Sequence, residues 1–217
     1  MSSFVSDNWE LLRDAFLTTL SLAVVSGLCA LVIGTMLAAM RVSPIAPLRW
    51  LATFYVEVFR NTPLTVVFFF FAFGIVFIDL QFPSRYITAV AALALYTAAF
   101  VCEAVRSGIN AVPAGQAEAA RAIGLTFGQT LREIVLPQAF RTVVPPLGNV
   151  WIALAKNTSI AAGFAVTELT AALQRLSNQE SGRLLTVFLA IVLAYLLITL
   201  PSAWLIRIIE RRVAIFR

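Results

Sequence analysis

Three ionised side chains interrupt apolar stretches of this sequence, in places where a charged group is costly. They are Glu57, Arg60 and Lys156. Charged residues in such stretches usually face a water-filled cavity or an opposite charge, so they mark candidate pathways for a polar solute. A guanidinium binds a carboxylate through two parallel hydrogen bonds, and an ammonium supplies a second positive charge. The chemistry that these residues predict is recognition and passage of an anionic solute.

The residues beside these charges add further polar groups. Asn61 or Thr62 can cap, and Pro63 can begin, a new helix that runs to Ile78, which would make this apolar segment discontinuous. The start of such a helix carries a positive partial charge that favours a carboxylate. Two cations and a helix end suit a substrate with more than one carboxylate. The polar residues that follow Lys156 are Asn157, Thr158 and Ser159.

A structural role is the alternative for both groups. Glu57 and Arg60 are three residues apart, so they can share a helix face and form an ion pair that locks two spans together. The run from 157 to 159 can instead hydrogen-bond between packed spans, as Ser, Thr and Asn commonly do. The residues alone leave both interpretations open.

The composition indicates a membrane protein. Hydrophobic residues make up 60% of the 217 residues and charged residues only 12%, which is more apolar surface than a soluble chain of this length can bury. The chain has no His, which excludes a His-based metal site or general base. Cys29 and Cys102 lie in apolar stretches, as buried small hydrophobes do. We expect no metal site and no catalytic residue in this chain, and the family resemblance described below implies no cofactor of its own.

The apolar runs predict an all-α, polytopic protein with five transmembrane helices. We expect a lead at 1–14, one transmembrane domain at 15–206 and a tail at 207–217. By the helical rise, Arg60 lies roughly 15 Å along the second span and Lys156 roughly 20 Å along the fourth, both near the bilayer middle. The fourth span is expected to start around Pro145-Pro146. The five spans are 15–40, 50–78, 86–105, 142–166 and 184–206, and 167–183 is expected to be a polar loop.

The distribution of arginine predicts the orientation. Positive charge accumulates on the cytoplasmic side of a membrane protein, so the richer side is assigned to the cytoplasm. The amino end is then outside and the carboxyl end inside, and the net charge of +5 needs no nucleic-acid partner. The poorer side holds Arg13, Arg85, Arg175 and Arg183. The richer side holds Arg41, Arg49, Arg106, Arg121, Arg132, Arg141, Arg207, Arg211, Arg212 and Arg217.

The stretch from Ala117 to Pro137 is the least apolar part between two spans. Pro113 can occupy the first position of a short helix, and Gly124 can close that helix with φ > 0. The hydroxyl and amide at 126 and 129 fit a capping box for a second helix. Pro137 marks where that helix must bend or end. This pattern suits a protein-docking element, and an ordinary connecting loop is the alternative. We call residues 106–141 the coupling segment.

Three motifs in the sequence resemble a known family. Glu118-Ala-Ala, followed by Gly124 and Ile134-x-Leu-Pro137, resembles the EAA loop of bacterial ABC importer permeases. Glu57-Val-Phe-Arg-Asn-Thr-Pro-Leu64 resembles the FR-x-TPL segment of the polar amino acid permeases among them. Lys156-Asn-Thr-Ser-Ile160 resembles the K-[ND]-[ST]-S-[LI] segment of the same subfamily. The resemblance covers nearly the whole chain, and MRVSP, SGIN and PLGN look closest to actinobacterial glutamate permease subunits.

This resemblance implies a type I ABC importer membrane domain in a bacterial plasma membrane. The substrate would be a polar amino acid, glutamate or aspartate, moved by alternating access. The implied partners are two cytoplasmic ATPase subunits, a second permease subunit, identical or homologous, and an extracellular substrate-binding protein. ATP and Mg would be bound by the ATPase, since the chain has no G-x-x-x-x-G-K-[ST] loop. The residues implied to couple to the ATPase are Glu118, Ala119, Ala120, Arg121, Gly124 and Leu125.

Two other functions are compatible with a membrane protein that carries charges inside its spans. An ion- or proton-coupled amino acid transporter subunit would use Glu57 and Arg60 directly. Five spans without an inverted repeat count against it, because such transporters usually contain repeats. A membrane anchor without transport activity has no use for buried charges.

Overall fold

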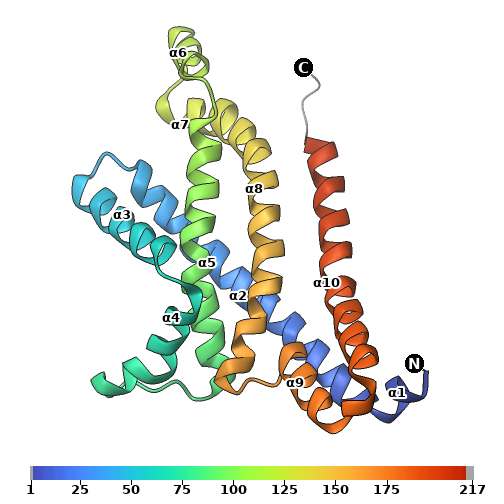
Figure 1. Ribbon diagram of the computed structural model, residues 1–217. Helices are drawn as coiled ribbons and strands as arrows, with labels where there is room; N and C mark the ends of the chain where they lie inside the picture. Colours follow the sequence, from blue (N-terminus) through green and yellow to red (C-terminus); the bar gives the residue numbers. More distant parts are fainter. Residues whose placement is uncertain (1, 214–217) are drawn as a thin grey trace.

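The computed structural model describes residues 2–213, and every regular element in that range is a helix (Figure 1). The predicted all-α class is confirmed. The α-helices are α1 (Ser2–Asp7), α2 (Trp9–Val42), α3 (Ala46–Asn61), α4 (Leu64–Phe69), α5 (Arg85–Asn110), α6 (Ala114–Ala122), α7 (Phe127–Gln129), α8 (Leu136–Asn157), α9 (Leu169–Gln179) and α10 (Leu184–Val213). Wider π-helical turns occupy η1 (Phe70–Gly74) and η3 (Thr130–Val135), and tighter 3₁₀ turns occupy η2 (Ile75–Ile78), η4 (Thr158–Phe164) and η5 (Ser181–Arg183).

Within the described range, three helices are long and apolar enough to cross a membrane unaided. They are α2, α5 and the segment Ser181–Arg212, which comprises η5 and all but the last residue of α10. Two further crossings are bent pairs: α3 with Leu64–Ile78 turns by 107°, and Phe127–Phe164 with α9 turns by 53°. Counting each bent pair as one span gives the five that the sequence predicts.

The spans approach closely where their side chains are small. A Cβ placed on Gly34 of α2 would lie 2.5 Å from the Cβ of Val101 and 2.7 Å from the carbonyl oxygen of Ala98, both on α5. Helices α5 and α8 meet in the same way at Gly108, whose carbonyl accepts a hydrogen bond of 2.9 Å from the Thr142 hydroxyl. Small residues let helix backbones pack by van der Waals contact where no hydrophobic effect drives helices together.

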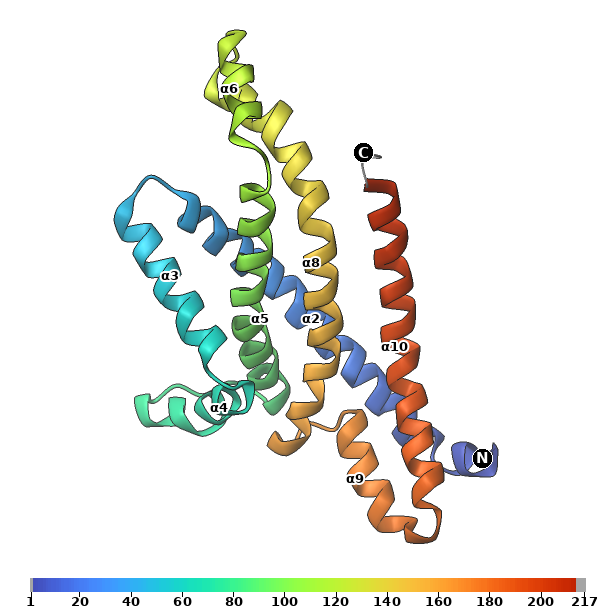
Figure 2. The same ribbon diagram turned by 45° about the horizontal axis from the view of Figure 1, so that its top comes forward.

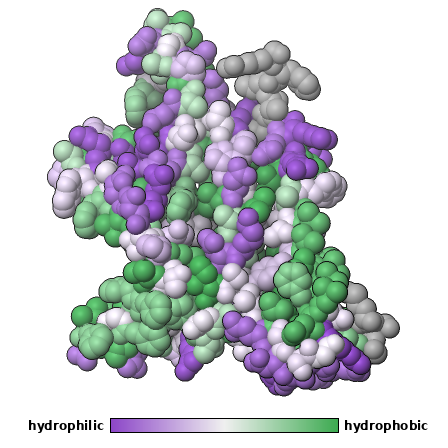
Figure 3. All heavy atoms as spheres, viewed as in Figure 1, coloured by the Kyte–Doolittle hydropathy of each residue, from purple (hydrophilic) through white to green (hydrophobic). Residues whose placement is uncertain are grey.

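The molecule has two distinct ends. Helices α6 and α7 and the end of α10 lie at one end, while α1 and α9 lie at the other (Figures 1 and 2). Hydrophilic residues gather over α6 and over α3, whereas apolar residues cover much of the lower flanks (Figure 3). The exposed apolar side chains of α10, such as Leu197 and Trp204, suit contact with lipid.

The region at 167–183, predicted to be a polar loop, contains helix α9. This prediction was wrong because the polar residues of the region occupy only one side of the helix. Leu169, Ala172 and Leu176 are fully buried at spacings of three and four residues, which is the helical period. Glu168 precedes the helix, and its side chain accepts a hydrogen bond of 2.9 Å from the backbone N–H of Ala171 as an N-cap.

Several prolines lie elsewhere than the sequence suggests. Pro145 and Pro146 lie inside α8, which begins nine residues earlier at Leu136, so they do not start the fourth span. Pro113 is the N-cap of α6 and not its first helical residue. Pro137 does not end its helix. The chain widens into the π-helical turn η3, which ends two residues before Pro137, and then continues as α8. The wider turn relieves the clash between a proline ring and the preceding turn.

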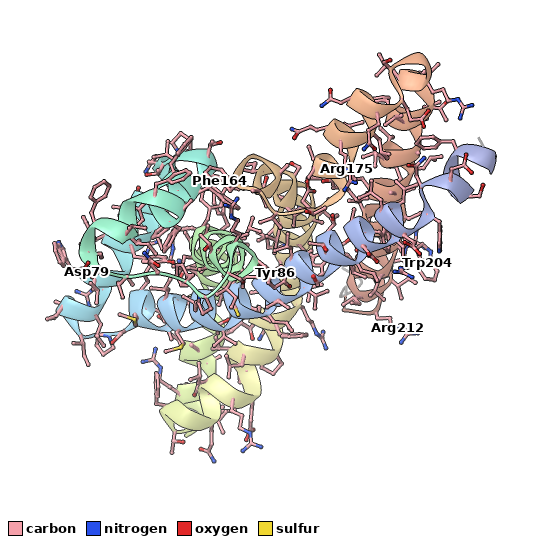
Figure 4. All side chains as sticks on the ribbon, turned by 90° about the horizontal axis from the view of Figure 1, so that it is seen from below. Asp79, Tyr86, Phe164, Arg175, Trp204 and Arg212 are labelled. Carbon is pink, nitrogen blue, oxygen red and sulfur yellow. The ribbon has the colours of Figure 1, made fainter. Side chains whose placement is uncertain are left out.

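An aromatic cluster joins η4, in the second bent crossing, to α4. The ring of Phe164 in η4 stacks on Phe68 at a centroid distance of 4.9 Å and meets Phe69 edge-on at 5.1 Å. Figure 4 shows Phe164 beside α4, with Tyr86 near the start of α5. Stacked and edge-on aromatic pairs add stability beyond the area that they bury. The two broken segments are therefore packed against each other.

Candidate substrate pathway and coupling segment

The break between α3 and α4 lies at Thr62 and Pro63. Both residues have extended backbone conformations. For Thr62 this agrees with the rule that proline disfavours the helical conformation of the residue before it. The discontinuity predicted here is therefore confirmed. The predicted cap is wrong, because Asn61 ends α3 and donates its amide to the Glu57 carbonyl at 2.8 Å, while the Thr62 hydroxyl donates to the Val58 carbonyl at 2.7 Å. Neither side chain caps α4.

Arg60 pairs with Glu103 of α5 and not with Glu57. Its Nη1 lies 3.8 Å from Oε1 of Glu103. The Glu57 carboxylate instead accepts a hydrogen bond of 3.1 Å from the Asn61 amide. The Glu57–Arg60 ion pair that the sequence suggested is therefore absent from the described part of the chain. The Arg60–Glu103 ion pair joins α3 to α5 instead.

Glu103 is a site residue that sequence reasoning missed. Its carboxylate also accepts hydrogen bonds from Arg41 at the end of α2 and from Arg106, the latter at 2.9 Å. Three arginines from three helices thus converge on one carboxylate. The signal was present in the sequence, because an acidic residue stands inside an apolar run at this position. Arg106 is only three residues away, but Arg41 and Arg60 are distant in the chain.

The second predicted cation, Lys156, lies next to the last residue of α8 and is exposed. Its ammonium forms neither a hydrogen bond nor an ion pair with any of residues 2–213. Thr158 is fully buried and donates its hydroxyl to the Ala155 carbonyl at 2.9 Å, which indicates a structural role. Ser159 is half-buried in η4.

Asn157 lines a cavity of about 350 Å³ between α5 and α8. The cavity is also lined by Tyr96, Phe100 and Asn149. Amide and hydroxyl groups at membrane depth are costly to leave facing lipid. The cavity contacts α5 near Tyr96, whereas Arg60 contacts α5 at Glu103. Arg60 and Lys156, the two predicted cations, therefore share no partner: Arg60 pairs with Glu103, whereas Lys156 forms no ion pair with any described residue.

The coupling segment has the local geometry that its sequence predicts. Gly124 has φ of +90°, as expected. The backbone N–H of Leu125 donates to the Ala120 carbonyl at 3.1 Å, and that of Gly124 donates to the Arg121 carbonyl at 3.0 Å, which together form a Schellman motif. The capping box is also present, since the Thr126 hydroxyl accepts from the backbone N–H of Gln129 and the Gln129 side chain accepts from Thr126.

Two large apolar side chains project from this otherwise polar segment. Ile123 is 81% exposed and Phe127 is 80% exposed. Glu118, Ala119 and Arg121 are also exposed, whereas Ala120 is buried. The segment protrudes from one end of the bundle (Figure 2). Apolar groups on a protruding polar segment mark a surface for contact with another protein.

Comparison with known proteins decides the family. Residues 30–215 match the model of the binding-protein-dependent transport system inner membrane component. The chain belongs to this family. A relative among the curated proteins is the glutamate transport system permease protein GluC of Corynebacterium glutamicum, which is 39% identical over 99% of both chains. Another is the glutamate/aspartate import permease protein GltJ of Escherichia coli K12, which is 34% identical over 92% of this chain and 86% of the relative.

Solved structures agree with the family assignment. The crystal structure of an amino acid ABC transporter with histidines contains a chain that superimposes with a TM-score of 0.88 at 30% identity, covering 96% of each chain. The MetNI methionine ABC transporter superimposes with a TM-score of 0.77 at 22% identity, which supports the fold alone.

Membership in this family has direct consequences for function. The chain is a multi-pass inner-membrane permease subunit of a binding-protein-dependent transport system. It is not the catalytic subunit, because in such a transporter ATP is bound and hydrolysed by a separate ATPase subunit. The system therefore includes an ATPase and a binding protein. The family assignment decides against the ion- or proton-coupled transporter considered from the sequence.

Proposed function

We propose that this permease subunit imports an acidic amino acid, glutamate or aspartate. The observation that carries the proposal is the pair of exposed cations beside the two chain breaks, Arg60 before Pro63 and Lys156 before η4. Both are costly in a span unless they face a polar path. The full-length similarity to permease proteins named for glutamate transport supports the same substrate class.

The proposed substrate pathway follows these breaks. The Arg60 side chain is 42% exposed, and Lys156 offers an ammonium without an internal partner in the described range. Each can receive one carboxylate of a dicarboxylic amino acid during successive steps of transport. The further pathway residues are Glu57, Asn61, Thr62, Asn157, Thr158 and Ser159. Thr158 would act through packing, because its hydroxyl is buried.

The coupling segment at 106–141 is the proposed contact with the ATPase. The exposed Ile123 and Phe127 support this assignment, because contact with a partner protein would bury both side chains away from water. Glu118 and Arg121 supply the surrounding charges that set orientation. Residues 119, 120, 124 and 125 shape the turn. We propose two copies of the ATPase, one for this subunit and one for a second permease subunit, identical or homologous.

The proposed orientation places the coupling segment in the cytoplasm and the amino end outside. The arginine-rich ends of the spans support this orientation, and helices α6 and α7 share an end of the bundle with the end of α10 (Figure 1). The transmembrane domain is then 15–206, between an outer lead at 1–14 and a cytoplasmic tail at 207–217.

Uptake of labelled glutamate into cells that express the complete transporter tests this proposal. Uptake should stop when ATP is depleted and should continue when an ionophore collapses the proton gradient. Unlabelled aspartate should compete, whereas neutral glutamine should compete at least about 10-fold less well, since it lacks the second carboxylate. Equal competition by glutamine would contradict the acidic substrate class.

A further inference from the structure

The arginine cluster around Glu103 links the proposed substrate pathway to the coupling segment. Glu103 lies on α5 seven residues before its last residue, Asn110, and α6 of the coupling segment begins at Ala114. Arg41, at the end of α2, and Arg60, at the end of α3, both form ion pairs with Glu103. One carboxylate therefore connects the ends of two helices to the helix that leads into the coupling segment.

The three arginines are not held equally. Arg41 donates to Oε1 of Glu103 and is only 13% exposed, and Arg106 donates to Oε2 at 2.9 Å. Arg60 is 42% exposed, and its 3.8 Å separation from Oε1 is too long for a hydrogen bond. Arg60 is thus the loosely held member of the cluster and keeps its donors available for another carboxylate.

The charge of the cluster favours binding of an additional anion. Three guanidinium groups face a single carboxylate, so two positive charges are in excess. The nearby Glu57 does not neutralise Arg60, because its carboxylate accepts from Asn61 and forms no ion pair with any described residue. A carboxylate near Arg60 would therefore be attracted by all three arginines, and only Glu103 would compete with it.

We propose that Glu103 is a positioning residue that competes with the substrate carboxylate for Arg60. Without substrate, Glu103 keeps the end of α3 beside α5. A substrate carboxylate replaces Glu103 as the partner of Arg60 and frees α5, with its attached coupling segment, from the end of α3. This inference rests on the proposed function, since it requires an anionic substrate.

Direct binding of glutamate to the purified permease–ATPase complex, without the binding protein, tests the inference. Glu103→Gln keeps the size of the side chain and one acceptor but removes the competing charge. Its Kd for glutamate should fall about 2- to 5-fold, the range that corresponds to a partly exposed ion pair. Arg60→Gln should raise the Kd, and the Glu103→Gln change should have no further effect in the Arg60→Gln background. This dependence on Arg60 separates competition from a general structural role.

A second variant controls for misfolding, which is a risk because Glu103→Gln leaves three arginines without a counter-ion. The double change Glu103→Gln with Arg41→Gln removes one of these charges and should also bind glutamate more tightly. An unchanged or raised Kd in both variants, or failure of both to assemble, would overturn the inference while the proposed function stands. Failure of the wild-type complex to bind any acidic amino acid would overturn the inference and the proposed substrate together.

Discussion

The carboxylate of Glu168 and the hydroxyl of Tyr195 lie 2.7 Å apart, and their hydrogen bond joins the start of α9 to α10. Glu168 is fully buried, and its other oxygen accepts from the backbone N–H of Ala171. The neighbouring backbone N–H of Leu169 donates to the Thr19 hydroxyl of α2 at 3.1 Å. One turn of chain therefore fixes α9 to two spans through groups that have lost their contact with water.

Removing this acceptor should destabilise the protein. Glu168→Ala leaves the Tyr195 hydroxyl and a helix N-terminus without their shared partner, which should cost about 1–3 kcal/mol. Glu168→Gln should cost less, because its amide keeps an oxygen acceptor. Thermal unfolding in detergent measures the difference, with Glu180→Gln at the more exposed end of α9 as a matched control. Equal melting temperatures for Glu168→Ala and the control would contradict this assignment.

The close contact between α2 and α5 yields a second prediction. Gly34→Ala would bring a methyl group against Val101 and against the backbone oxygen of Ala98, which cannot rotate away. We expect a destabilisation of about 1–3 kcal/mol, as for overpacking of a tight core. Gly115→Ala in α6 is the control, because nothing lies within 4 Å of its Cβ position. The apparent melting temperature should fall for Gly34→Ala alone, and an equal fall for both variants would refute the packing argument.

The turn of the coupling segment can be tested without touching the spans. Gly124→Ala places a side chain on a residue with φ of +90°, at a cost of about 1–2 kcal/mol. We expect normal membrane insertion, but weaker copurification of the ATPase and less ATP hydrolysis in response to substrate. Gly128→Ala is the matched control, since it lies in α7 and meets nothing within 4 Å. Full coupling in Gly124→Ala would show that the turn does not position the ATPase contact.

The coupling segment and the arginine cluster differ in how well the sequence predicts them. The turn at Gly124 and the box formed by Thr126 and Gln129 depend on residues within one or two helical turns, so local chemistry predicts them. The partners of Glu103 include Arg41, which is 62 residues away, and no local pattern specifies such a pair. The charges at Glu57 and Arg60 suggested a pair by their spacing, but α5 brings a competing carboxylate close to Arg60.

Helix α9 shows a different kind of failure. Leu169, Ala172 and Leu176 repeat with the helical period, so a signal for the helix was present. The surrounding polar residues favoured a loop, and the burial of Glu168 depends on Tyr195, 27 residues away. The bend of 107° after α3 was predictable as a break at Pro63, but the aromatic packing of α4 against η4 joins segments that are distant in the chain, so local patterns do not predict it.

The proposed membrane orientation rests on the arginine distribution and can be tested directly. Ser181 should lie outside the cytoplasm and Arg217 inside it, and reporters fused after each residue should show these locations. The physical reason is the cost of translocating short segments that are rich in arginine. Alkaline phosphatase and green fluorescent protein, each fused at both positions, provide reciprocal signals. Activity of the same reporter at both positions would contradict a single membrane crossing between Ser181 and Arg217.

Transport by charge variants at the proposed pathway tests the central claim most directly. The complex is reconstituted into proteoliposomes with its binding protein, and ATP-dependent glutamate uptake is measured for the wild type, Arg60→Gln and Lys156→Met. Arg13→Gln serves as a control, because its charge is paired with Asp14 at the surface. We predict uptake by the wild type and the control, and a loss of about 10-fold or more in both pathway variants, as expected for a charge-assisted hydrogen bond. The variants should still assemble with the ATPase. Undiminished uptake by both pathway variants, or no ATP-dependent glutamate uptake by the wild type, would contradict the account.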